Sequence, residues 1–108
     1  MSGSLLTHNV YFALNDASPA GVKALIEAAK KYLVRHPGVM HFAVGTLCRE
    51  LERPVNDRDF DVALHIVFKD KASHDVYQKA ALHEKFVAEM KPNWKKVRVF
   101  DSLVEEVV

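Results

Sequence analysis

The sequence predicts an α+β fold whose elements follow one another in the order β-α-β-β-α-β. Four segments alternate apolar and polar residues with the period of two that is typical of strands: residues 5–14, 39–48, 60–68 and 94–104. The intervals that follow the first and the third of these segments repeat apolar residues at helical spacing. At 108 residues the chain suits one domain and leaves no room for a second.

Alternating apolar and polar residues predict the first strand, and a typical N-cap followed by proline predicts the start of the first helix. One face of residues 5–14 carries Leu6, His8, Val10, Phe12 and Leu14. Ser18 is a typical N-cap, and Pro19 suits the first helical position. The helix then runs to Arg35 and is ended by His-Pro-Gly at 36–38. Its apolar face carries Val22, Leu25, Ile26, Ala29 and Leu33.

The second and third strands are separated by the polar segment 49–59, the only long loop that the sequence predicts. One face of the second strand carries Met40, Phe42, Val44, Thr46 and Cys48, and the other carries Val39, His41, Ala43 and Leu47. One face of the third carries Phe60, Val62, Leu64, Ile66 and Phe68.

The second helical region is predicted to begin at Asp70 or Ser73 and to end at Met90, before Lys91-Pro92. If it forms one helix, its apolar stripe consists of Val76, Ala80, His83, Val87 and Met90. The strand at 94–104 completes the split βαβ pattern of a ferredoxin-like domain.

Two helical regions can cover only one face of a four-stranded sheet. On the other face the second and third strands place several apolar residues, which are costly to leave in water. We therefore expect a homodimer that forms through the helix-free face, because isologous pairing is the commonest oligomer symmetry. His41 and His65 lie on that face, so protonation below about pH 6 is expected to weaken the dimer.

Composition excludes several functional classes. With a net charge of +1 and no strong Lys/Arg cluster, the chain is not expected to bind nucleic acid. No apolar run is long enough for a membrane span, and Cys48 is the single cysteine, so a cytoplasmic protein is expected. No His-x3-His or His-Glu-x-x-His motif places two metal ligands on one helical face, so neither a metal nor another cofactor is expected.

Several features in order resemble the stress-responsive dimeric α/β-barrel (Dabb) family. They are His8 in the first strand, Pro-Gly-Val at 37–39, F-D-V-A-L-H-I-V-F at 60–68 and Y-x5-H-x2-F at 77–86. Val-Phe-Asp at 99–101 agrees as well. The resemblance covers residues 6–104, and it leaves residues 1–5 as a flexible N-terminus and 105–108 as a C-terminal tail.

The resemblance implies a homodimer with facing sheets and, in each protomer, a pocket between the sheet and its own helices. One branch of the family is a plant polyketide cyclase that closes an aromatic ring by aldol condensation. His83, Tyr77, His8 and Trp94 occupy the places of its pocket residues. Ala80 and Ala81 stand where the family often has His-Pro. On an unbroken helix Tyr77 and His83 would point about 120° apart.

Two hypotheses about function follow. In the first, the protein is a cofactor-free cyclase or lyase in which His83 removes a proton next to a carbonyl and Tyr77 or His8 stabilises the oxyanion. The substrate pocket would be lined by Val10, Phe12, Leu25, Ile26, Phe42, Leu64, Phe86 and Trp94. In the second, the protein is a non-catalytic homodimer that binds a small apolar ligand or a partner in a stress response. Apart from both hypotheses, His83 could be a packed core histidine with a satisfied hydrogen bond and no cavity beside it.

Overall fold

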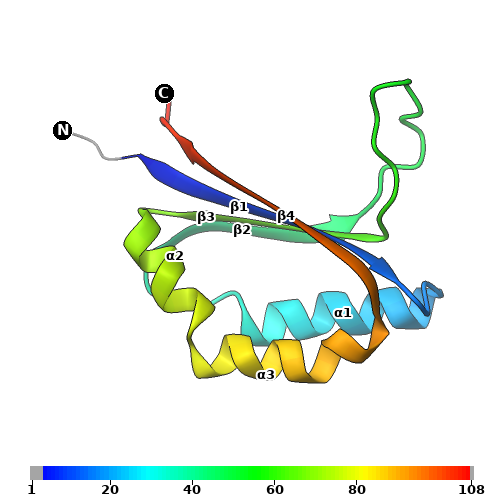
Figure 1. Cartoon of the computed structure of the whole chain (residues 1–108), viewed down its shortest axis with the longest axis horizontal. Helices are drawn as coiled ribbons and strands as arrows, with labels where there is room; N and C mark the ends of the chain where they lie inside the picture. The colour runs from blue at the N-terminus through cyan, green and yellow to red at the C-terminus, as the bar shows by residue number, and fades with distance from the viewer. Residues whose placement is uncertain (1–3, 108) are drawn as a thin grey trace.

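The computed structural model describes residues 4–107, which form a four-stranded antiparallel sheet with helices on one face (Figure 1). The strands are β1 (Leu5–Leu14), β2 (Val39–Thr46), β3 (Val62–Phe68) and β4 (Trp94–Val104). The helices are α1 (Pro19–Tyr32), α2 (Lys71–Gln78) and α3 (Ala81–Met90), followed by a short 3-10 turn, η1 (Lys91–Asn93). The strand order is β2-β3-β1-β4. The predicted ferredoxin-like fold is confirmed.

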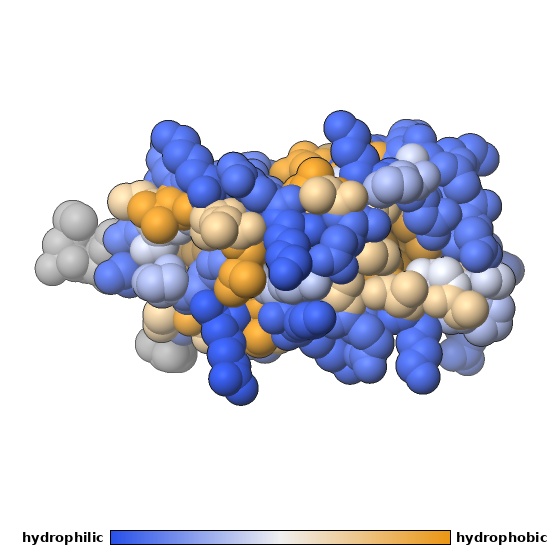
Figure 2. All heavy atoms as spheres, turned by 90° about the horizontal axis from the view of Figure 1, so that it is seen from below, coloured by the Kyte–Doolittle hydropathy of each residue, from blue (hydrophilic) through white to orange (hydrophobic). Residues whose placement is uncertain are grey.

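The hydrophobic core lies between the sheet and the helices. Alternation in the two central strands buries one face of each: Leu6, Val10, Phe12, Leu14, Val62, Leu64, Ile66 and Phe68. From α1 come Leu25, Ala29, Tyr32 and Leu33. Each fully buried aliphatic or aromatic side chain contributes about 1.5–3 kcal/mol, so this layer dominates the stability of the fold. The outer side of the helix layer is largely hydrophilic, with scattered apolar patches (Figure 2).

The N-terminus of α1 follows the prediction. Ser18 is the N-cap, and its hydroxyl accepts a hydrogen bond from the amide of Gly21 at 3.3 Å. Pro19 occupies the first helical position, where a missing N–H costs nothing. The helix ends at Tyr32, three residues before the predicted end, although Leu33 still packs into the core.

Two predictions about the faces of the strands are wrong. A register shift between Val39 and His41 turns Val39 toward the core and leaves Met40 62% exposed, the reverse of the predicted pattern. The third strand begins only at Val62, and Phe60 packs against the ring of Tyr11 on the helix-free face, with ring centroids 4.9 Å apart. Phe60 therefore does not share a face with Val62.

The second helical region is two helices rather than one. Asp70 caps α2, and its carboxylate accepts a hydrogen bond from the amide of Ser73 at 2.8 Å. The chain then turns at Ala80, which has extended backbone angles (φ −68°, ψ 144°) and is the N-cap of α3. The predicted stripe is therefore wrong at its start, because Val76 is exposed and Tyr77 is buried.

The ends of the chain are described in part. Leu5 already pairs with Val104 at the outer ends of β1 and β4. Residues 1–3 of the predicted N-terminal segment and residue 108 of the predicted tail lie outside the described residues. Within residues 4–107, no helix has the length and apolar character needed to cross a membrane.

Candidate functional site

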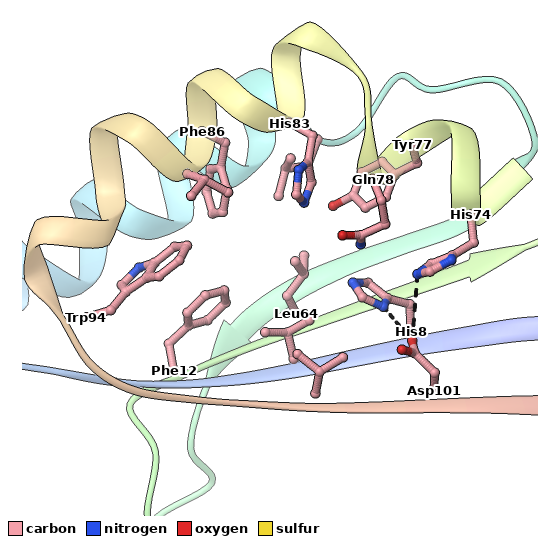
Figure 3. Close-up of a pocket in the computed structure, with 14 residues that line it drawn as sticks. His8, Phe12, Leu64, His74, Tyr77, Gln78, His83, Phe86, Trp94 and Asp101 are labelled. Carbon is pink, nitrogen blue, oxygen red and sulfur yellow. Dashed lines mark hydrogen bonds and ion pairs between the residues drawn. The ribbon is translucent and has the colours of Figure 1, made fainter.

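A cavity of about 320 Å³ lies between the sheet and helices α2 and α3 (Figure 3). Its walls come from segments far apart in the sequence, with β1, β3 and β4 on one side and the two helices on the other. Fourteen residues line it: His8, Val10, Phe12, Leu33, Leu64, His74, Tyr77, Gln78, His83, Phe86, Val87, Trp94, Val99 and Asp101. The cavity is therefore an apolar chamber that holds a small number of polar groups.

The structure brings the three predicted reactive residues, His8, Tyr77 and His83, to this one cavity. The ring centroids of Tyr77 and His83 are 4.8 Å apart, and those of His8 and Tyr77 are 5.9 Å apart. Tyr77 and His83 meet because the chain breaks at Ala80, so the divergence expected of an unbroken helix does not occur. The Tyr77 hydroxyl points toward the cavity (Figure 3).

The predicted apolar lining is found in part. Val10, Phe12, Leu64, Phe86 and Trp94 line the cavity. Leu25, Ile26 and Phe42 do not line it; Leu25 is fully buried in the core, and Ile26 and Phe42 pack against the core. The reason is that α1 packs directly against β2, β3 and α3, whereas the cavity lies beneath α2 and α3.

Trp94 forms the aromatic end of the cavity. Its ring lies 5.0 Å from that of Phe12 and 5.9 Å from that of Phe86, measured between centroids. The indole Nε1 is buried and has no hydrogen-bond partner among the described residues. A polar atom of a bound molecule could satisfy this donor.

Three polar residues of the cavity, His74, Gln78 and Asp101, were not predicted. The His74 side chain is only 14% exposed, and its ring lies 5.0 Å from that of His8. Asp101 pairs with His8 in the register of β1 and β4. The ring of His36 packs 4.9 Å from that of Tyr77, and its Nε2 lies 2.9 Å from the carbonyl oxygen of Tyr32.

The His8 ring is held in place by Asp101. Its Nδ1 lies 2.6 Å from Oδ1 of Asp101, so Nδ1–H donates to the carboxylate and Nε2 keeps its lone pair. Burial lowers the pKa of His8, and the bond to Asp101 and its charge partly oppose this effect. The neutral form of this ring is therefore favoured at neutral pH.

The other two rings are also neutral at pH 7. Burial lowers the pKa of His83, and the nearby His8 and His36 lower it further. Burial raises the pKa of the Tyr77 hydroxyl well above its usual value, so this group remains a proton donor. No hydrogen bond to the His83 ring is found among residues 4–107. The cavity thus combines an unpaired neutral base with a neutral hydroxyl donor.

Three of the lining residues could hold a cation. His8, His74 and Asp101 each offer one ligand atom, and these atoms lie within 4.8 Å of one another. The residues come from β1, α2 and β4, so no sequence motif marks the group.

Solved structures with the same fold cover nearly the whole chain. A protein of the Dabb family from Mesorhizobium loti with a ferredoxin-like fold is 26% identical, with a TM-score of 0.78 over 95% of this chain and 99% of that one. A dimeric ferredoxin-like protein of unknown function from Thermobifida fusca is 19% identical, with a TM-score of 0.78 over 96% and 94%. The hydroxynitrile lyase from Passiflora edulis is 19% identical, with a TM-score of 0.75 over 98% of both chains.

Comparison of the sequence itself identifies the family. No curated protein matches the chain. The profile of the Stress responsive A/B Barrel Domain, Dabb, matches residues 6–104, which span all four strands but for the first residue of β1. The chain therefore belongs to the Dabb family of stress-responsive A/B barrel domains.

Proposed function

We propose that the protein catalyses a proton transfer of the cyclase or lyase kind on a small apolar carbonyl compound bound in the cavity. One observation carries the proposal: the rings of His8, Tyr77 and His83 converge on a chamber whose remaining walls are mostly apolar. A pocket of this kind can hold an aliphatic or aromatic substrate while a few polar groups orient it.

His83 is the proposed general base. Its neutral imidazole accepts the proton from the carbon next to the substrate carbonyl, and the electron pair of the broken C–H bond moves toward the carbonyl oxygen. The Tyr77 hydroxyl donates a hydrogen bond to the enolate oxygen that forms. In a cyclase the enolate carbon attacks a second carbonyl, which forms a C–C bond and leaves an alkoxide. In a lyase the enolate re-forms the carbonyl and a C=C bond as the bond to a leaving group on the next carbon breaks. Protonated His83 then gives its proton to that alkoxide or to the leaving group.

His8 is the proposed second polar contact for the substrate. Asp101 holds the ring through Nδ1, so its orientation is set before a substrate binds.

The structurally similar protein from Passiflora edulis is named a hydroxynitrile lyase. This name supports a lyase reaction as one of the two reaction types proposed for the present fold.

The test is hydrogen exchange at the α-carbon of the substrate. The wild-type protein is incubated in D2O with a panel of small apolar ketones and aldehydes, and loss of the α-proton signal is followed by NMR. We expect faster exchange for at least one compound than in its protein-free control. His83→Ala should lower the enzymatic rate by about 10²- to 10⁴-fold.

The matched control is His41→Ala, which removes an exposed histidine of β2 outside the cavity. It should exchange at the wild-type rate. Exchange by His83→Ala at the wild-type rate would contradict the proposed base. Saturable binding of a panel compound without exchange would instead favour the alternative function, a non-catalytic ligand-binding protein.

We also infer a homodimer that forms through the helix-free face of the sheet. On that face the Tyr11 ring lies 4.9 Å from Phe60, and 5.8 Å from both His65 and Phe100, between centroids. Phe100 is 51% exposed in the single chain. Structural relatives described as dimeric support this assembly.

A cytoplasmic location is part of the proposal. Cys48 is a free and exposed cysteine. A reducing compartment would keep such a thiol from forming disulfides between chains.

A further inference from the structure

We propose that His8, His74 and Asp101 form a binding site for a divalent transition-metal ion such as Zn²⁺. The three side chains meet at the end of the cavity away from Trp94 (Figure 3). One ligand atom from each lies within 4.8 Å of the other two. The residues are brought together by the pairing of β1 with β4 and by the position of α2 over the end of β1.

The Nε2 atom of His74 carries a lone pair that accepts no hydrogen bond from any described residue. Its Nδ1 lies 3.1 Å from Oδ1 of Asp75, so Nδ1–H donates to that carboxylate, which also receives a hydrogen bond from Lys71 at 2.7 Å. The proton is thereby fixed on Nδ1, and Nε2 is left as an acceptor. This Nε2 is buried and has no hydrogen-bond partner among residues 4–107.

The acceptor Nε2 of His74 faces a second acceptor. It lies 4.0 Å from Oδ1 of Asp101, too far for a hydrogen bond and with no donor available from either atom. Two acceptors that face each other in a partly buried site are stabilised by a positive charge between them. A metal ion supplies this charge and binds both atoms at once.

The third ligand is His8. Its Nδ1 lies 2.6 Å from the same Asp101 oxygen. Two ligand atoms on Zn²⁺ lie about 3.0–3.4 Å apart. The two distances to the Asp101 oxygen are 2.6 and 4.0 Å, and all three ligand atoms lie within 4.8 Å of one another, so metal binding needs side-chain movements of about 1 to 2 Å. Coordination through Nδ1 requires the ring proton to move to Nε2, which is the other tautomer of neutral imidazole.

The donor set indicates the class of metal. Two imidazoles and one carboxylate suit zinc, cobalt, iron(II) or manganese better than calcium or magnesium, which prefer oxygen ligands. The Asp75 carboxylate behind His74 is the second-sphere partner that histidine ligands commonly have. Because the Asp101 side chain is 40% exposed, positions for water or a substrate oxygen remain on the metal. The site shares His8 with the proposed substrate pocket, but the proposed base His83 and the hydroxyl donor Tyr77 do not belong to it.

The experiment uses Co²⁺ as the probe, because its visible absorption reports coordination by protein ligands. Tag-free protein is treated with a chelator, exchanged into metal-free buffer and titrated with Co²⁺. We expect one saturable site per chain. Loss of an outer-sphere partner alone typically weakens metal binding about 10- to 100-fold, so removal of a ligand in His74→Ala should weaken Co²⁺ binding by at least that factor. Asp101→Asn tests the same site at an exposed position where the side chain keeps its shape, and it should also bind more weakly.

The matched control is His41→Ala, which also removes one histidine but on β2, outside the cavity. It should bind Co²⁺ as the wild type does. The proposal is overturned if wild type shows no saturable site, if both His74→Ala and Asp101→Asn bind with wild-type affinity, or if His41→Ala abolishes binding. Because the readout is metal binding and not turnover, failure of the proton-transfer proposal leaves this result unaffected.

Discussion

At the scale of single residues, the neutral His83 ring is the feature on which the proposed chemistry depends. It lies against Tyr77 at the cavity wall and is only half-buried. Burial is the main cause of its lowered pKa, and the histidines around it act in the same direction. A base of this kind is unprotonated at neutral pH and remains available when the substrate binds.

The pH dependence of exchange should follow the His83 pKa. The groups that act on this ring are His8 from β1, His36 after α1, His74 from α2 and Glu84 on α3; only Glu84 raises the pKa. Since the pKa lies below its ordinary value of 6.5, the rate should be constant above pH 6.5 and fall only at lower pH. The measurement is the pH profile of α-proton exchange. A rate that already falls between pH 8 and pH 7 would contradict the assignment of the base.

The same shift predicts a contribution to stability. The unfolded chain protonates position 83 at a higher pH than the folded chain does, so protonation favours unfolding. The contribution of His83 is therefore fully present above pH 6.5 and is lost as the pH falls through the lowered pKa. Chemical denaturation between about pH 8 and pH 5 should show a smaller loss of stability in His83→Ala than in wild type. If the unfolding free energies of wild type and His83→Ala depended on pH in the same way, the lowered pKa of His83 would be contradicted.

Some site residues could be found from the sequence and others could not. His8 and His83 stand out because each is a polar side chain within an apolar pattern. His74 lacks that signal, and its ring reaches the cavity only because α2 packs over His8 and Phe68. In the sequence Asp101 cannot be distinguished from an ordinary carboxylate on a strand. Only the register of β1 and β4 places it opposite His8.

At the scale of elements, the break between α2 and α3 determines which side chains enter the cavity. It forms without proline: the amide of Ala80 donates to the carbonyl of Tyr77 at 3.1 Å, and the amide of Lys79 donates to the carbonyl of Val76 at 3.1 Å. These tight i→i+3 bonds end α2. Ala80 and Ala81 stand where the family often has His-Pro, and neither alanine is a local sequence signal for a break.

A pair of proline substitutions tests this account of the break. Ala81 is the first residue of α3, and the extended backbone of Ala80 before it suits a residue that precedes proline. Ala81→Pro should therefore be neutral or stabilise the protein by about 0.4–1 kcal/mol. Ala80→Pro removes the hydrogen bond to Tyr77 and should destabilise the protein. Chemical denaturation gives the unfolding free energy of both variants. A destabilised Ala81→Pro beside a neutral or stabilised Ala80→Pro would contradict a break at Ala80.

At the scale of the whole molecule, one face of the sheet is covered by no helix (Figure 1). Tyr11, Phe60 and Phe100 form an aromatic cluster there, and His41 and His65 are exposed on the same face. The sequence predicts such a face from element order alone. It does not reveal that Phe60 belongs to it, because that depends on where β3 begins. Weakening of the dimer by protonation stays a prediction.

One substitution tests the proposed dimer face. Phe100→Asp places a charge in the aromatic cluster and should convert the dimer to a monomer, because burying an unpaired carboxylate is costly. Val55→Asp is the control, since it makes a similar change at an exposed apolar residue of the loop between β2 and β3. Sedimentation should show a monomer for the first variant and a dimer for the second. If Phe100→Asp formed a dimer with the affinity of the wild type, the interface would have to lie on another surface.

The most direct test of the account is the unfolding free energy of His83→Ala compared with wild type, without ligand. If His83 lines a functional cavity, the variant should lose less than about 1 kcal/mol. Phe86→Ala, one turn further along α3 and buried in the core, should lose about 3–5 kcal/mol and shows that the measurement detects core truncation. A loss of about 2 kcal/mol or more in His83→Ala would mean that the histidine completes the core, and it would contradict the proposed site.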